Sequence, residues 1–176
     1  MKSARVITTF ECNRNCPYCS NNYESLISQG REEDNLNFIE DYDEIILTGG
    51  EPMLYPEQII DLVIRIREIK SDIIIYLYTA NYKFLLERLI GLIDGITYTL
   101  HERCSFKDVE NFQVVQQMAM EFSYDKSFRL FINKNNEKAI TIMPDLWDRI
   151  KIAGTLSEED CDYPEDDLII LKEWGL

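Results

Sequence analysis

The sequence has no long hydrophobic run. No stretch approaches the roughly 18 consecutive apolar residues of a membrane-spanning helix. The chain opens with Met1-Lys2-Ser3 and then a strand-like run, with no apolar leader between them. We therefore expect neither a membrane span nor a signal peptide, and we expect a cytoplasmic protein.

Positive charge is also scarce. The chain has 18 Lys and Arg against 32 Asp and Glu, which gives a net charge of −14. Binding to a nucleic-acid backbone rests on clustered Lys and Arg, so nucleic acid is not expected to be the main partner. A small molecule, a peptide or a protein fits this charge better.

The length excludes a large second domain. With 176 residues, of which 45% are hydrophobic, the chain can bury one substantial core. We expect a single domain over residues 1–176. Its recognisable core covers residues 6–133, and residues 134–176 complete it without a sharp motif.

Cysteine is present but has no secretory context. Three of the five cysteines lie in the segment Cys12-Asn13-Arg14-Asn15-Cys16-Pro17-Tyr18-Cys19. Three thiolates can bind three irons of a four-iron cluster and leave one iron open. A structural zinc ion would need a fourth ligand, and the nearest candidates, His101 and Cys104, lie far along the chain. Free thiols and an iron-sulfur cluster both suit a reducing compartment.

A second motif follows about thirty residues later. The apolar run 43–48 is a predicted strand, and it ends in Gly49-Gly50-Glu51-Pro52. Glycines let the backbone pass close to a ligand. Alone, this tetrapeptide would indicate a turn between a strand and a helix. After a three-cysteine segment it is much more specific.

Together, the cysteine segment and residues 49–52 resemble the radical S-adenosylmethionine enzymes. The resemblance implies that Cys12, Cys16 and Cys19 bind a 4Fe-4S cluster and that residues 49–52 hold the methionyl group of S-adenosylmethionine. It places the backbone of Tyr18 against the adenine. An external donor such as flavodoxin or ferredoxin would reduce the cluster, which cleaves S-adenosylmethionine to a 5′-deoxyadenosyl radical that abstracts a hydrogen atom from a substrate.

Strand and helix patterns alternate along the chain. They predict an α/β fold, and the resemblance narrows it to a partial (β/α)5-6 TIM-like open barrel of parallel strands with the active site at their carboxyl ends. The predicted strands are 6–10, 43–48, 73–79, 95–101, 128–133 and 150–154, and residues 168–174 form a last strand or helix. Helices are predicted over 20–29, from Pro56, over 83–93 and after Ser105, and residues 30–35 are a predicted loop.

Several polar residues lie near predicted strand ends. By resemblance, Thr79 and Asn81 are candidate cofactor or substrate contacts, although a plain strand end or helix cap fits them as well. Strict alternation puts Thr99 and His101 on the inner face of their strand, where the resemblance makes them and Glu102 candidates for a ribose contact.

Four further residues have side chains that are capable of chemistry. Arg129 and Asn133 share one face of their strand, and the guanidinium could meet a carboxylate of cofactor or substrate. Cys104 is a candidate hydrogen-atom donor or a small buried thiol. Cys161 lies in an acidic stretch, 157–167, that resembles a surface loop.

The specific reaction stays open at the level of the sequence. The short chain is similar to glycyl-radical activases such as those of anaerobic ribonucleotide reductase, and to carboxy-deazaguanine synthase-type enzymes. A peptide modifier is the third candidate, and the reaction type stays open between oxidoreductase, lyase and isomerase. An iron-sulfur or zinc module without catalysis is the alternative of another class, although such a module has no need of residues 49–52.

Overall fold

One parallel sheet organises the molecule. The computed structural model describes residues 1–16, 19–154 and 166–175. Within these residues, eight strands form a single sheet in the order β2-β8-β1-β3-β4-β5-β6-β7, and every neighbouring pair is parallel. The strands are β1 Ser3–Thr9, β2 Arg31–Glu33, β3 Glu44–Gly49, β4 Ile74–Thr79, β5 Gly95–Leu100, β6 Ser127–Asn133, β7 Arg149–Ala153 and β8 Asp167–Leu171.

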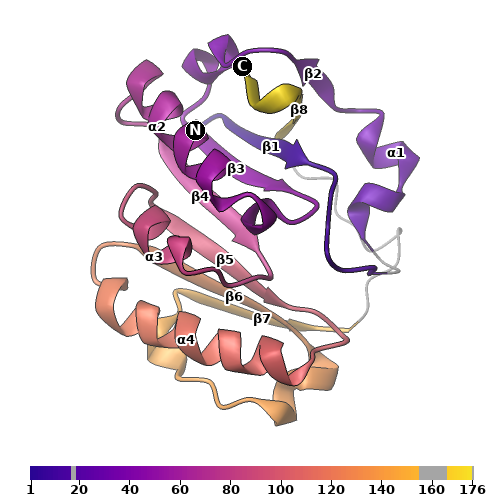
Figure 1. The fold of residues 1–176 in the computed structure, drawn as a ribbon, viewed down its shortest axis with the longest axis vertical. Helices are drawn as coiled ribbons and strands as arrows, with labels where there is room; N and C mark the ends of the chain where they lie inside the picture. The colour runs from indigo at the N-terminus through magenta and orange to yellow at the C-terminus, as the bar shows by residue number, and fades with distance from the viewer. Residues whose placement is uncertain (17–18, 155–165, 176) are drawn as a thin grey trace.

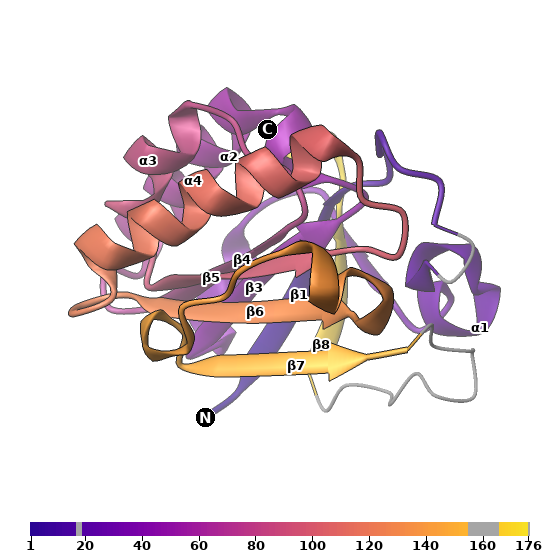
Figure 2. The same ribbon diagram turned by 90° about the horizontal axis from the view of Figure 1, so that it is seen from below.

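The sheet is curved and covered by helices on one face. The three main helices, α2 Pro56–Ile69, α3 Leu85–Ile90 and α4 Phe106–Phe122, all lie on the same side of the sheet (Figure 1). Figure 2 shows that the strands near the two edges, β7 and β8, curve away from these helices. The sheet is open because β2 and β7 do not pair. The predicted open, partial barrel of parallel strands is thus confirmed.

Alternation along the strands separates the two faces. In β5, the side chains of Ile96, Tyr98 and Leu100 point to the helices and are at most 1% exposed. The intervening Thr97 and Thr99 are half-buried on the inner, concave face. This period-two pattern places the apolar core between the sheet and the helices.

The number of strands exceeds the prediction, and one predicted loop is wrong. Residues 30–35 contain β2, which pairs with β8 at one edge of the sheet. A short edge strand that is rich in charge has no apolar alternation to reveal it. The prediction of a strand near residues 150–154 is confirmed by β7, and the choice between strand and helix at 168–174 is decided by β8.

The predicted alternation of strands and helices does not continue through the whole chain. After β6 the chain forms only the 3₁₀ turns η4 Lys134–Ala139 and η5 Pro144–Leu146. Within the predicted helix 83–93 only α3 forms, and the residues on either side of it make single turns. The segment 20–29 splits into η1 Ser20–Asn22 and α1 Glu24–Ile27. The remaining 3₁₀ turns are η2 Asn37–Asp41, η3 Pro52–Leu54 and η7 Glu173–Gly175.

Two glycines allow β1 and β3 to meet closely at their carboxyl ends. Gly49 has a φ of +131°, and a Cβ on it would lie 2.3 Å from the carbonyl oxygen of Thr9. A Cβ on Gly50 would lie 2.1 Å from the carbonyl oxygen of Glu11. Since both obstacles are backbone atoms, a side chain at either position would push the two strand ends apart.

Gly49→Ala should therefore destabilise the protein. Strain in a disfavoured backbone conformation costs about 1–3 kcal/mol, and we expect a loss of that size in the free energy of unfolding measured with urea. Gly91→Ala is the matched control, because its nearest obstacle lies at 3.4 Å and no positive φ is involved. Equal stability of the two variants would contradict the close approach.

Candidate active site

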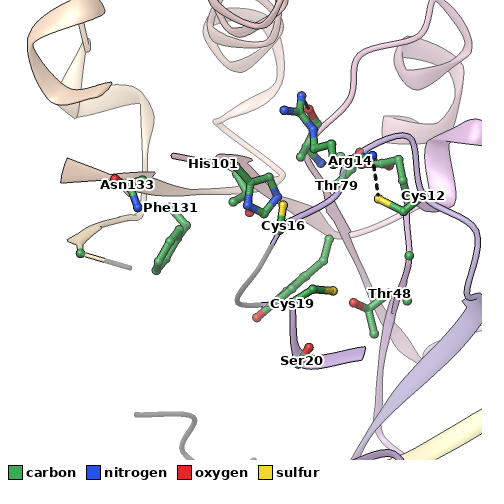
Figure 3. Close-up of a pocket in the computed structure, with 17 residues that line it drawn as sticks. Cys12, Arg14, Cys16, Cys19, Ser20, Thr48, Thr79, His101, Phe131 and Asn133 are labelled. Atoms are coloured by element: carbon green, nitrogen blue, oxygen red, sulfur yellow. Dashed lines mark hydrogen bonds between the residues drawn. The ribbon is translucent and has the colours of Figure 1, made fainter. Parts of the chain in front are cut away.

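A cavity of about 320 Å³ opens at the carboxyl ends of β3, β4, β5 and β6 (Figure 3). Parallel strands bring their carboxyl ends to one edge, which is why residues far apart in the sequence meet there. Most of the predicted site residues line this cavity: Cys12, Cys16, Cys19, Gly49, Gly50, Glu51, Thr79, Thr99, His101 and Asn133.

The three cysteines come from the loop after β1. A turn joins Cys19 to Cys16 through an N–H···O bond of 3.1 Å, and the N–H of Arg14 donates to the Sγ of Cys12 at 3.4 Å. Burial raises the pKa of Cys16, and the neighbouring Cys19 and Cys12 raise it further. The raised pKa keeps the Cys16 thiol protonated in the metal-free protein, so binding of metal to its sulfur would release a proton.

The arrangement of the sulfurs fits a cluster better than a single ion. Among the described residues, no three His, Cys, Asp or Glu side chains converge closely enough to hold one metal ion. A zinc ion requires such convergence of four ligands. In a four-iron cluster each cysteine binds a different iron, so three sulfurs spread around one cavity match that group.

Glu51 fixes the wall of the cavity. Its carboxylate is 2% exposed and accepts three hydrogen bonds, from the Thr79 hydroxyl at 2.6 Å, the Ala80 N–H at 2.9 Å and the Met53 N–H at 2.9 Å. Burial raises the pKa of Glu51, and these donors act against that rise. Because its oxygens are already bonded within the protein, the carboxylate ties the end of β3 to the end of β4 and holds the backbone of Gly49 and Gly50 in the cavity.

Comparison with known proteins identifies the family. The model of the Radical SAM superfamily matches residues 6–102, which is more than half of the chain. The chain belongs to the radical SAM superfamily. Its cofactors are therefore a 4Fe-4S cluster and S-adenosylmethionine, as the resemblance implied. No curated protein matches the chain.

In this radical SAM protein, some predicted residues lie away from the cavity of the cysteines. Pro52 is buried at the start of η3, Asn81 lines a neighbouring cleft, and Arg129 lines a second cavity on the concave face. Cys104 donates its S–H to the carbonyl oxygen of His101 at 3.1 Å, and burial, followed by the charge of Asp108, raises its pKa to about 11.

The remaining predicted residues are placed as follows. Glu102 lines the neighbouring cleft with Asn81. Tyr18 and Cys161 lie outside the described residues, and their roles stay predictions. No helix in the described part of the chain is long and apolar enough to cross a bilayer.

Sequence reasoning missed several residues of the radical SAM site. Tyr78 and Phe131 line the cavity from β4 and β6. Alternation carried a usable signal for Phe131, since it shares its face with Arg129 and Asn133, but not for Tyr78, whose strand is apolar on both faces. Thr48, Ser20 and Gly154 also line the cavity, but no sequence pattern singled them out.

Arg14, in the middle of the cysteine loop, was missed as well. Its guanidinium donates to the carbonyl oxygen of Ala80 at 3.0 Å and pairs with the carboxylate of Asp108. Asp108 is the fourth residue of the capping box that Ser105 begins, at position N3 of the helix, which confirms the predicted start of α4. Burial raises the pKa of Asp108, but the hydrogen bonds from Arg14 and Ser105 outweigh it, so the pKa lies below its usual range. The pair thus anchors the cysteine loop to β4 and α4.

His101 is neutral at physiological pH. Burial, followed by the positive charge of Arg14, lowers its pKa from 6.5 to about 4. Its carbonyl oxygen accepts from Cys104 and from the amide of Asn136, which fixes the backbone at this point. A neutral imidazole on the cavity wall can accept or donate a hydrogen bond but adds no charge beside a cationic cofactor.

We expect Arg14 and Asp108 to be energetically coupled. In a double-mutant cycle with Arg14→Ala and Asp108→Ala, the coupling energy from urea unfolding of the metal-free protein should be about 1–3 kcal/mol. The cycle is needed because Asp108 also caps α4. Arg103→Ala replaces an exposed arginine nearby and should be additive with Asp108→Ala. Additivity of the Arg14 and Asp108 changes would contradict the anchor.

The titration of His101 provides a second test. The chain has one histidine, so its imidazole proton signals in an NMR titration of the metal-free protein are unambiguous. The midpoint should lie near pH 4, and the unfolded chain should take up this proton near pH 6.5. Since the unfolded state then binds more protons, this group lowers stability as the pH falls from 6.5 to 4. A midpoint at or above 6.5 would contradict the buried, neutral state.

Proposed function

We propose that this protein is an enzyme that cleaves S-adenosylmethionine reductively and uses the resulting radical on a substrate. When bound, the cluster passes one electron from an external reductant to S-adenosylmethionine, which breaks the bond between sulfur and the 5′ carbon, releases methionine and leaves a 5′-deoxyadenosyl radical that takes a hydrogen atom from the substrate. A flavodoxin or ferredoxin is the proposed reductant, and the cytoplasm is the proposed location.

The chain's own residues supply position and shelter. Cys12, Cys16 and Cys19, which all line the cavity, would hold the cluster. The backbone of Gly49 and Gly50 forms the wall beside it, where side chains would block close approach. This wall keeps its shape because the buried carboxylate of Glu51 accepts three hydrogen bonds. The cofactor therefore meets a preformed site.

One observation carries the proposal: the cysteines and the glycine pair line the same cavity although they come from different strands. A cluster carrier without catalysis needs only the cysteines. A cavity of about 320 Å³ beside them lies within the range of small-molecule binding sites, which is roughly 300–1,000 Å³. The combination favours an enzyme over an electron-transfer module or a zinc module.

Replacement of a cluster cysteine should abolish cleavage. Anaerobically reconstituted protein with dithionite and S-adenosylmethionine should release 5′-deoxyadenosine, and Cys16→Ala should reduce this release to background in a chromatographic assay. Cys104→Ser is the matched control, because this cysteine lies outside the lining of the cavity, and it should retain the release. A Cys16→Ala variant as active as the wild type would refute the assignment of the cluster.

A further inference from the structure

Cations gather on the concave face of a strongly acidic protein. Arg129 of β6 pairs in register with Arg149 of β7, and Phe131 pairs with Lys151. Side chains that alternate along a strand return to the same face at every second residue, so the two arginines and the lysine point to one side of the sheet. With strands about 4.8 Å apart, these charges are close neighbours.

These residues line a cavity of about 250 Å³. The strand register places further residues beside Arg129 and Phe131 on the neighbouring strands. Thr97 of β5 pairs with Arg129, and Thr99 pairs with Phe131, while Tyr78 of β4 pairs with Thr97. The floor of the cavity therefore combines three cations with hydroxyl groups and aromatic rings.

This cavity adjoins the candidate active site. Tyr78, Thr99 and Phe131 line both cavities. A molecule seated over the cations would thus extend toward the cysteines and the glycine pair. Figure 3 shows Phe131 and Asn133 on the β6 side of the candidate active site.

In the part of the chain that the structure describes, no ion pair neutralises the three cations of the second cavity. Arg129, Arg149 and Lys151 form no salt bridge within 4.0 Å with any carboxylate of the described residues. Arg129 lies over the ring of Tyr76 at 4.1 Å, and Lys151 lies 5.7 Å from the centre of the Phe131 ring.

Two described carboxylates lie near these cations. Asp166 binds Arg5 at 2.7 Å and accepts from Ser3. Burial raises the pKa of Glu44, although the nearby Arg129 and Arg5 act against this rise. Glu44 thus interacts with Arg129, while neither carboxylate forms a salt bridge with Arg149 or Lys151.

A hydroxyl on the floor of the cavity also lacks a partner. The Oγ1 of Thr97 is buried and makes no hydrogen bond within the described residues. An unsatisfied buried polar atom is costly. Since this oxygen is covered by protein, the groups that the cavity presents to a ligand are the three cations.

We propose that this second cavity binds the carboxylate or phosphate group of a small-molecule substrate, an assignment that rests on the proposed function. Arginine presents a planar fork that matches both groups. A volume of about 250 Å³ accepts a small anion and leaves the rest of the substrate to reach the shared wall.

The competing explanation is protection of an edge strand. β7 is the last strand of the sheet, and charged side chains on an edge discourage pairing with other chains. This explanation predicts no specific anion site. It also leaves Arg129 unexplained, since β6 is paired on both sides.

Titration calorimetry at low salt with the full-length protein can decide between the two. The probes are inorganic phosphate and malonate, a small dicarboxylate. Arg149→Gln and Arg129→Gln should each weaken binding of the preferred probe by about tenfold or more, because each removes a charge-assisted hydrogen bond. Arg88→Gln removes one positive charge from the exposed surface of α3 and should leave the affinity within about twofold.

The outcomes separate this inference from the proposed function. Preference for phosphate or for malonate identifies the anionic group. If neither probe binds the wild type, or if Arg88→Gln weakens binding as much as Arg149→Gln, the inference is wrong, even where the same preparation still releases 5′-deoxyadenosine. Anion binding without that release would overturn the proposed function and leave the anion site standing. Arg129→Lys, which keeps the charge, replaces Arg129→Gln if the latter does not fold.

Discussion

The buried carboxylate of Glu51 is the interaction on which the site depends. A carboxyl group on a residue that is 2% exposed needs hydrogen-bond partners, and here they are Met53 on its own turn and Thr79 and Ala80 at the end of the next strand. Removal of a donor would leave a buried polar group with too few partners. The requirement fixes two strand ends relative to each other, and so fixes the wall that faces the cysteines.

One face of the sheet forms the hydrophobic core, and the other face carries the polar residues that line the cavities. The convex face is apolar and packs on α2, α3 and α4, while the concave face carries threonines, tyrosines and cations. All strands run in one direction, so their carboxyl ends gather the cysteine loop, the glycine pair and His101 at one edge. Although the net charge is −14, Arg129, Arg149 and Lys151 together line the cavity beside this edge.

Much of this could be predicted from the sequence, because the strongest signals were local. The cysteine spacing, the glycine pair and the alternation in β5 each concern a few adjacent residues. The edge strand β2 escaped because three charged residues carry no periodicity. The Arg14–Asp108 pair escaped because it joins residues 94 positions apart, and no local pattern reports such a contact. The sequence also could not show that Arg129 and the cysteines line two different cavities, because this depends on how far along β6 each cavity extends.

If the proposed function is correct, the bound cluster would present an open iron to S-adenosylmethionine beside Gly49 and Gly50. Electron-nuclear double resonance on the reduced, cluster-loaded protein can test this, with S-adenosylmethionine labelled at its amino nitrogen or its carboxylate oxygens. We expect a hyperfine coupling between the label and the cluster. A fully loaded cluster whose spectrum is unchanged by saturating labelled cofactor would contradict it.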